Sequence, residues 1–331
     1  MSTDAVKSLS LAPWRKRSSA RLFFDLALIG IGIAAFFVFP SNLGFVTRVL
    51  IMIILVLSLD LVIGYAGIAT LGHAALFGSG AYAAGLFAVY VSADPITGLA
   101  VGAVAGGIIA FLSGLILLRA TGLTLLMLSV AIAQILLEIA NKERPITGGS
   151  DGLLGIDMDP IFGVFAFDFL GKTGFWYVFI VLVVVFFFLK LVVSSPFGLA
   201  ARGIHESPAR MRAIGTPVYW RLVAVYTLAG TIAGIAGALS AQVTELVSLE
   251  ALGFTLSAEA LIMLILGGTG RLYGAIFGTL IFMSVHHWAA SIDPFNWLFV
   301  IGGLVLVVVF FVPHGLLGLP AKLRQWTGPK R

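Results

Sequence analysis

The chain has 331 residues, of which 60% are hydrophobic and 11% are charged, and its mean hydropathy is +1.10. Soluble domains carry roughly 25% charged residues, so this composition excludes a soluble protein and leaves no room for a sizeable soluble domain. The net charge of +5 does not indicate nucleic-acid binding, because the basic residues lie in short flanks between apolar runs, and the lack of cysteine excludes disulfides and thiolate metal sites.

Apolar runs long enough to cross a bilayer follow one another from residue 22 onwards. The basic segment 1–21 precedes a first run that is long and lacks a small-residue cleavage site, so we interpret it as a retained span. The sequence therefore predicts an all-α, polytopic membrane protein with about ten transmembrane helices, at 22–39, 45–63, 68–91, 96–118, 122–140, 174–193, 218–242, 255–269, 272–291 and 296–313. These spans define a transmembrane domain over 22–315, which a tail at 316–331 follows. The eighth segment, 255–269, is short enough to be re-entrant.

The distribution of Lys and Arg predicts the orientation. With ten spans and a cytoplasmic N-terminal segment, the tail at 316–331 and the segment 194–217 are cytoplasmic too. Four of the 20 Lys and Arg residues then lie outside, and the other sixteen lie on or near the inside; the four are Arg48, Lys142, Arg144 and Lys172. Cytoplasmic flanks carry an excess of Lys and Arg, which supports this orientation.

The predicted outer loop, 141–173, contains a glycine-rich run from Thr147 to Gly152, followed by further acidic residues. Glycines at this density make tight turns. Asp151, Asp157 and Asp159 lack the alternating spacing and the terminal Glu of a calcium-binding loop. We therefore expect a docking or gating loop and no metal site.

The segment 194–217, called the insert below, contains the signals for two short helices. Ser195 can cap the first helix with Pro196 at its first position, and Ser207 and Pro208 repeat the pattern. Gly215 then ends the second helix. The double cap favours an ordered docking element over the alternative, a solvated basic loop that only fixes the topology.

The first insert helix is expected to be amphipathic. Apolar residues recur at spacings of three and four and form one stripe, which consists of Phe197, Ala200, Ala201 and Ile204. Arg202 and Glu206 are four residues apart, a spacing that allows an ion pair, while Arg210 and Arg212 add positive charge.

Glycines recur every four residues in three sets, which begin at Gly98, Gly230 and Gly270. Small residues at this spacing let helix backbones approach closely in lipid, so we interpret the first two sets as packing contacts. The stretch from Gly64 to Gly85 holds six glycines, and broken or close-packed helices of this kind often line transport routes.

The chain carries no motif for its own energy source or for an enzyme. It has no phosphate-binding loop, no Ser/His/Asp arrangement and no paired carboxylates, so we expect neither catalysis nor a cofactor. Asp25, Asp60 and Glu259 are acids within predicted spans, a small set for an ion relay. An ion-coupled secondary transporter that acts without an ATPase therefore stays open, as does a scaffold protein.

Several blocks together resemble the LivM-type permease subunit of bacterial ATP-binding-cassette (ABC) importers for branched-chain amino acids, over roughly residues 45 to 315. The matching blocks are Gly64-Tyr65-Ala66-Gly67, Leu71-Gly72-His73-Ala74, Gly78-x-Gly80-Ala81-Tyr82, Thr147 to Leu153, Ser195-Pro196-Phe197-Gly198, Ala213-Ile214-Gly215 and Leu266-Gly267-Gly268-x-Gly270. The resemblance implies a type II importer-like permease that pairs with a homologous second permease in the bacterial inner membrane. Two ATPase subunits and a periplasmic substrate-binding protein complete such a transporter.

The resemblance also implies roles for particular residues. The insert would contain the coupling helices that contact the ATPases, through Ser195, Pro196, Phe197, Gly198, Ala201, Arg202, Glu206, Arg210 and Gly215. The translocation pathway is expected along Gly67, Gly72, His73, Gly78, Gly80, Glu259, Gly268 and Gly270, although a hydrogen-bonded packing role is the alternative for His73 and Glu259.

The chain departs from the family pattern in three places. Ile68, Ala69 and Thr70 follow Gly67 where Gln and Ser are usual, Arg271 replaces a Ser or Thr, and Asp60 stands where Asn is more common. These changes lie in or beside the expected pathway. The substrate therefore stays open between branched-chain amino acids, urea, short amides and aromatic acids.

Overall fold

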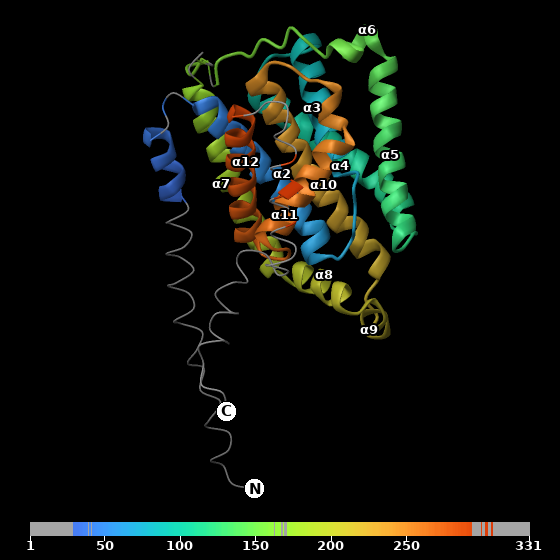
Figure 1. The fold of residues 1–331 in the computed structure, drawn as a ribbon. Helices are drawn as coiled ribbons and strands as arrows, with labels where there is room; N and C mark the ends of the chain where they lie inside the picture. Colours follow the sequence, from blue (N-terminus) through green and yellow to red (C-terminus); the bar gives the residue numbers. More distant parts are fainter. Residues whose placement is uncertain are drawn as a thin grey trace, which may run out of the picture.

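A computed structural model of the chain describes residues 29–292, except residues 39, 41, 162, 167, 169 and 170, together with residues 299, 302, 303 and 306. Most of this part is helical (Figure 1). The elements are a short helix Ile29–Val38, α2 Leu43–Asp60, a π-helical turn η1 Leu61–Tyr65, α3 His73–Tyr90, α4 Pro95–Leu117, α5 Leu123–Lys142, α6 Arg144–Thr147, η2 Gly149–Asp151, α7 Lys172–Ser194, α8 Pro196–Glu206, α9 Pro208–Ala213, α10 Val218–Thr244, η3 Leu249–Leu252, α11 Phe254–Gly267 and α12 Leu272–Ile292. Within the described residues, extended pairing is limited to two isolated bridges, Leu153–Val247 and Ile161–Phe165.

Six described helices are long and apolar enough to cross a membrane, and each matches an expected span: α2 with η1, α4, α5, α7, α10 and α12. The expected span 68–91 begins as a helix only at His73, because Gly67 has a left-handed backbone (φ +71°) and residues 66–72 form a turn and loop. α11 has 14 residues. It therefore rises about 21 Å, less than the ~30 Å of a hydrocarbon core. The segments 1–21 and 316–331 and most of 296–313 lie outside the described residues.

α2 forms the centre of the bundle. The helix is apolar on every side over most of its length, and all the residues from Val49 to Asp60 are buried. It contacts α7, α10, α11 and α12 on different sides. A helix that is apolar all round is stable only where other helices or lipid surround it, and α2 is surrounded by helices.

α3, α4 and α10 form a second packed group whose backbones touch at glycines. A side chain on Gly106 would overlap the backbone of Gly230 and Gly234, and one on Gly80 would overlap Gly234. Gly102 approaches Ala238 and the Gly234 carbonyl in the same interface. The packing interpretation of the Gly98 and Gly230 sets is therefore confirmed.

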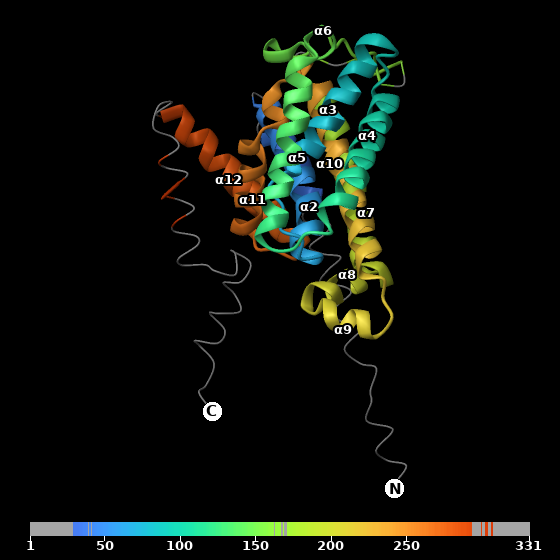
Figure 2. The ribbon, with the colours of Figure 1, turned by 90° about the vertical axis from the view of Figure 1, so that its right-hand side faces the viewer.

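The bundle has two distinct ends. α8 and α9 lie at one end, called the α8 end, and α6 lies at the other, called the α6 end (Figure 1). Figure 2 shows the same separation and shows that α12 slants outward from the bundle. Large apolar side chains of α4, α5 and α7 are exposed between the two ends, including Val104, Phe111, Ile135 and Val184. Such a surface suits contact with lipid rather than with water.

Candidate functional site

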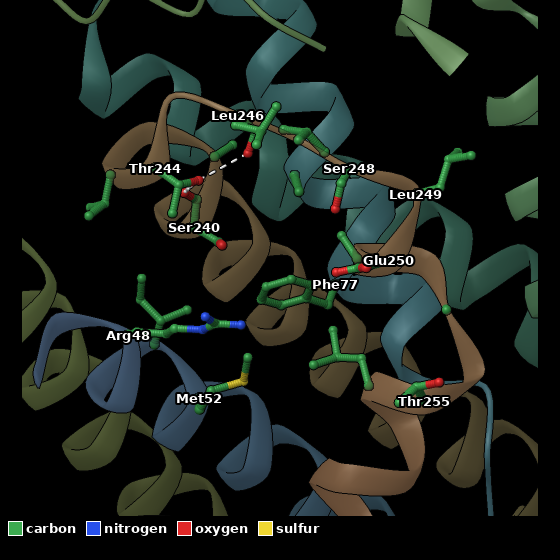
Figure 3. Close-up of a pocket in the computed structure, with 18 of the residues that line it drawn as sticks. Arg48, Met52, Phe77, Ser240, Thr244, Leu246, Ser248, Leu249, Glu250 and Thr255 are labelled. Carbon is green, nitrogen blue, oxygen red and sulfur yellow. Dashed lines mark hydrogen bonds between the residues drawn. The ribbon is translucent and has the colours of Figure 1, made fainter. Parts of the chain in front are cut away.

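An open cavity of about 690 Å³ lies near the α6 end, between α2, α3, α10, η3 and α11. Its walls come from the second turn of α2, the last turn of α10, the link that follows α10 and the first turns of α11. Figure 3 shows the side chains around it. We call it the charged cavity, because Arg48, Glu250 and Glu259 all line it.

The charged side chains of this cavity come from different walls. Arg48 on α2 and Glu250 in η3 point toward one another across the space, with Phe77 between them (Figure 3). Arg48 also attracts Glu259 on α11 electrostatically, but in the described part of the chain it forms no ion pair with either acid. Met52, Phe77 and Leu256 supply apolar wall. The cavity therefore offers a cation, two carboxylates and an apolar surface to one small molecule.

The predicted outer loop supports one wall of the charged cavity. Leu153 and Val247 exchange backbone hydrogen bonds of 2.8 and 3.2 Å, and Val247 lines the cavity. The Thr244 hydroxyl donates to the Leu246 carbonyl (3.0 Å; Figure 3), which holds the start of the link after α10. The loop and the cavity wall thus form one unit at the α6 end.

The insert at the α8 end has the two capped helices that its sequence predicts. The Ser195 hydroxyl accepts a hydrogen bond from the Gly198 N–H (3.4 Å) and caps α8. The Ser207 hydroxyl accepts one from the Arg210 N–H (3.4 Å) and caps α9. Gly215 follows α9 with a left-handed backbone (φ +83°). Both caps and the glycine stop are confirmed.

α8 is docked on the bundle rather than solvated on all sides. Ala201 and Ile204 are buried, and Arg221 of α10 lies over the Phe197 ring, 5.9 Å from its centroid. The guanidinium of Arg202 lies 4.6 Å from the centroid of the Tyr65 ring in η1. No ion pair joins Arg202 to Glu206 within the described residues, so a contact with the turn η1 takes the place of the local pair that their spacing allows.

A second open cavity of about 700 Å³ lies at the α8 end, between the insert, the loop 66–69 and the turn before α5. Gly67, His205, Arg212 and Trp220 are among its lining residues. We call it the insert cavity. Glu206 and Arg210 of the insert are exposed.

Comparison with known proteins supplies the family. Residues 41–309 match the family described as the permease component of branched-chain amino acid transport systems. The chain belongs to this family. The matched range covers most of the chain and agrees with the resemblance expected over residues 45 to 315.

Three curated relatives carry LivM names. The chain is 28% identical to the high-affinity branched-chain amino acid transport system permease protein LivM of Salmonella typhimurium, over 89% of the chain and 74% of the relative. It is 25% identical to the protein of the same name from Escherichia coli, with the same coverage. The probable branched-chain amino acid transport permease protein LivM of Methanocaldococcus jannaschii is 26% identical over 79% of the chain and 88% of the relative. No solved structure matches the chain.

The expected pathway residues of this multi-pass permease do not all lie together. Glu259 lines the charged cavity and Gly67 lines the insert cavity. The other six contact neighbouring segments: Gly72 meets Ser129, Gly78 meets Leu252, Gly80 meets Gly234, Gly268 meets Gly274, Gly270 meets Gly64, and His73 Nε2 lies 2.7 Å from the Ser58 hydroxyl. A role in translocation stays a prediction for all eight residues.

Two residues of the charged cavity were not expected from the sequence. From the sequence, Arg48 is only one of four basic residues expected outside, and Glu250 belongs to none of the motifs that indicate a site. The sequence does contain a signal for Arg48, because an arginine inside a run of apolar residues is costly in lipid and points to a function. Glu250 lies between two apolar helices in a short link, where its position gives no comparable signal.

Proposed function

We propose that this permease is a transmembrane subunit of an ABC importer that carries branched-chain amino acids inward across the bacterial inner membrane. Its relatives are named for this substrate class. The proposal includes about ten spans with both termini cytoplasmic, so that the α8 end faces the cytoplasm and the α6 end faces the periplasm. The observation that carries it is the insert, a doubly capped two-helix element docked on the end of the central helix.

The charged cavity supports an amino acid as the substrate. A free amino acid carries a carboxylate and an ammonium group, and Arg48 and the two glutamates offer the opposite charges. Arg binds carboxylates through paired N–H donors, and a carboxylate accepts hydrogen bonds from an ammonium group. Phe77, Met52 and Leu256 would then face a branched aliphatic side chain. Urea carries no charged groups that could pair with Arg48 or with the acids, which makes it a poorer fit.

The partners follow from the same proposal. A homologous second permease would complete the pathway, and a periplasmic binding protein would deliver the substrate at the α6 end. Two ATPase subunits would dock on the insert, where Arg210 and Glu206 are exposed. Ser195, Pro196, Gly198 and Gly215 shape the insert, while Phe197, Ala201 and Arg202 fix it to the bundle.

A secondary transporter coupled to an ion gradient is the second candidate. The observation that favours it is Asp60, which is fully buried and has one carboxylate oxygen without a hydrogen-bond partner among the described residues. A buried carboxylate of this kind is a common ion-binding group in carriers.

The test is purification of the permease from its native membrane, identification of the proteins that accompany it, and uptake by proteoliposomes. The proposal expects an ATPase and a second permease in the preparation, and uptake of leucine, isoleucine or valine that requires ATP and the binding protein. Ala200→Glu and Arg210→Glu should weaken ATPase association, whereas Ala200→Ser should not. Gradient-driven uptake by the permease alone would favour the secondary transporter instead.

A further inference from the structure

Asp60 joins two parts of the permease that are far apart in the sequence. Its side chain is fully buried at the junction of α2 and η1. Its Oδ1 accepts a hydrogen bond of 2.7 Å from the backbone N–H of Gly270, in the turn between α11 and α12. The other oxygen, Oδ2, has no hydrogen-bond partner among the described residues.

Gly64, one turn after Asp60, allows this contact and adds a second one. A side chain at Gly64 would overlap both Asp60 Oδ1 and the backbone of Gly270. The Gly64 carbonyl accepts a hydrogen bond of 3.2 Å from His205 Nδ1, which carries the proton because a carbonyl can only accept. The turn η1 therefore contacts the α11–α12 turn on one side and α8 on the other.

Arg202 strengthens the contact between α8 and η1. Its guanidinium lies over the Tyr65 ring, and its positive charge attracts the Asp60 carboxylate. Arg202 and His205 are three residues apart, so they lie on neighbouring positions of α8 and both face η1. α8 is thus fixed to η1 by two side chains.

The two elements that meet at Asp60 both extend to the charged cavity. α2 carries Arg48 near its first turns and ends at Asp60, while α11 carries Thr255 and Glu259 and ends just before Gly268. The junction itself is π-helical, a rare geometry that is frequent at functional sites. A shift of η1 between π-helical and α-helical turns would move Gly64 relative to Asp60.

We propose that Asp60 is a positioning residue that couples α8 to the α11–α12 turn, so that movement of α8 is transmitted to both walls of the charged cavity. This proposal rests on the proposed function, because it assumes that ATPases move α8. The essential atom is the acceptor Oδ1, which binds Gly270. The side-chain amide of Asp60→Asn keeps this acceptor oxygen and has N–H donors in place of Oδ2. The methyl group of Asp60→Ala removes the acceptor.

The test measures coupling in the complete transporter, reconstituted with its ATPases and binding protein. The readouts are complex yield, substrate molecules taken up per ATP hydrolysed, and the KM for the loaded binding protein. We expect Asp60→Asn to keep the uptake per ATP near that of the unmodified complex. Asp60→Ala should assemble, but its uptake per ATP should fall at least about fivefold while the KM for the loaded binding protein stays unchanged. A change of this size lies at the lower end of typical coupling between two sites.

His205→Ala provides a second test, because His205 is exposed and its removal leaves the core intact. We expect it to lower uptake per ATP as well, and the double variant Asp60→Ala with His205→Ala should be no worse than the more severe single variant. If Asp60→Ala does not assemble, the proposal is tested by His205→Ala alone. Uptake per ATP that is unchanged in His205→Ala then overturns the proposal.

Two further results would overturn it. Either Asp60→Ala keeps the normal uptake per ATP in an assembled complex, or the effects of the two substitutions multiply as for independent sites. Both results would contradict the coupling role of Asp60 and leave the proposed function intact, provided that the unmodified complex performs ATP-driven uptake. Failure of the unmodified complex to do so would instead contradict the proposed function.

Discussion

The Tyr177 hydroxyl on α7 donates a hydrogen bond of 3.0 Å to the side-chain oxygen of Gln242 on α10. The Gln242 amide in turn donates to the Pro95 carbonyl at the start of α4, at 2.8 Å, so one buried side chain joins three helices. Polar groups inside a membrane bundle are costly without partners, and here each partner belongs to a different helix. This network holds the α6 end of the bundle, where the charged cavity opens.

Replacement of Gln242 by leucine should destabilise the permease. It removes the amide donor of the Pro95 carbonyl, which then depends on the Tyr177 hydroxyl 3.2 Å away, and the expected loss is about 1–2 kcal/mol in the free energy of unfolding. Thermal unfolding of the purified protein in detergent measures it. Tyr177→Phe should cost less, because the Gln242 to Pro95 bond survives, and the double variant should cost less than the sum of the two. Additive effects would contradict a shared network.

The glycine contacts between α4 and α10 should tolerate no side chain. Gly234→Val would place methyl groups against the backbone of Gly102 and Gly106. We expect this overpacking to lower the free energy of unfolding by about 1–3 kcal/mol or more. Size-exclusion chromatography of the solubilised protein after heating measures the surviving fraction. Gly30→Ala is the matched control, because a Cβ at Gly30 meets nothing within 4 Å. Equal survival of both variants would show that the backbones do not touch at Gly234.

The cap of α9 should control the order of that helix. Ser207→Ala removes the acceptor for the Arg210 N–H, which typically costs about 1 kcal/mol. Hydrogen exchange of the backbone amides in residues 209–213 should therefore accelerate by roughly fivefold. Ser207→Asp keeps an acceptor and should leave the exchange slow. If both variants exchange like the unmodified protein, contacts with other elements order α9 instead of the cap.

The sequence predicts what depends on near neighbours and fails where partners are distant. The Ser195 and Ser207 caps involve atoms three residues apart, and they form as expected. The hydrogen bond from Gly270 to Asp60 spans 210 positions, and no local pattern indicates it. Arg202 illustrates the conflict directly, because a partner four residues away was available but the guanidinium lies over Tyr65.

The charged cavity could not be assembled from the sequence for the same reason. Arg48 and Glu250 come from opposite walls, and only the packing of α2 against α10 and α11 brings them to one space. Hydrophobic periodicity identifies which segments form helices, but it does not specify which helices pack together. The glycine sets were the exception, because small residues mark a close helix contact even when the partner helix is unknown.

Arg48 should be needed for substrate passage if the charged cavity receives an amino acid. Arg48→Gln removes the cation that faces the substrate carboxylate, and we expect at least about a tenfold loss of uptake, equivalent to about 1.4 kcal/mol. Arg48→Lys keeps the charge and should retain part of the activity, which separates loss of charge from loss of shape. Uptake is measured with labelled leucine in cells that lack other leucine transporters, at matched protein levels. Full activity of Arg48→Gln would exclude the charged cavity as a carboxylate site.

The orientation of the bundle can be tested by cysteine labelling, because the chain contains no cysteine of its own. Ser150 lies exposed at the α6 end, Ala209 is exposed on α9, and Ser291 is exposed at the end of α12. With ten spans and cytoplasmic termini, a membrane-impermeant maleimide should label Ser150→Cys and Ser291→Cys in cells whose inner membrane is intact. Ala209→Cys should react only after that membrane is opened. Complete labelling of each variant in detergent is the control, and labelling of Ala209→Cys in intact cells would place the insert on the wrong side for an ATPase.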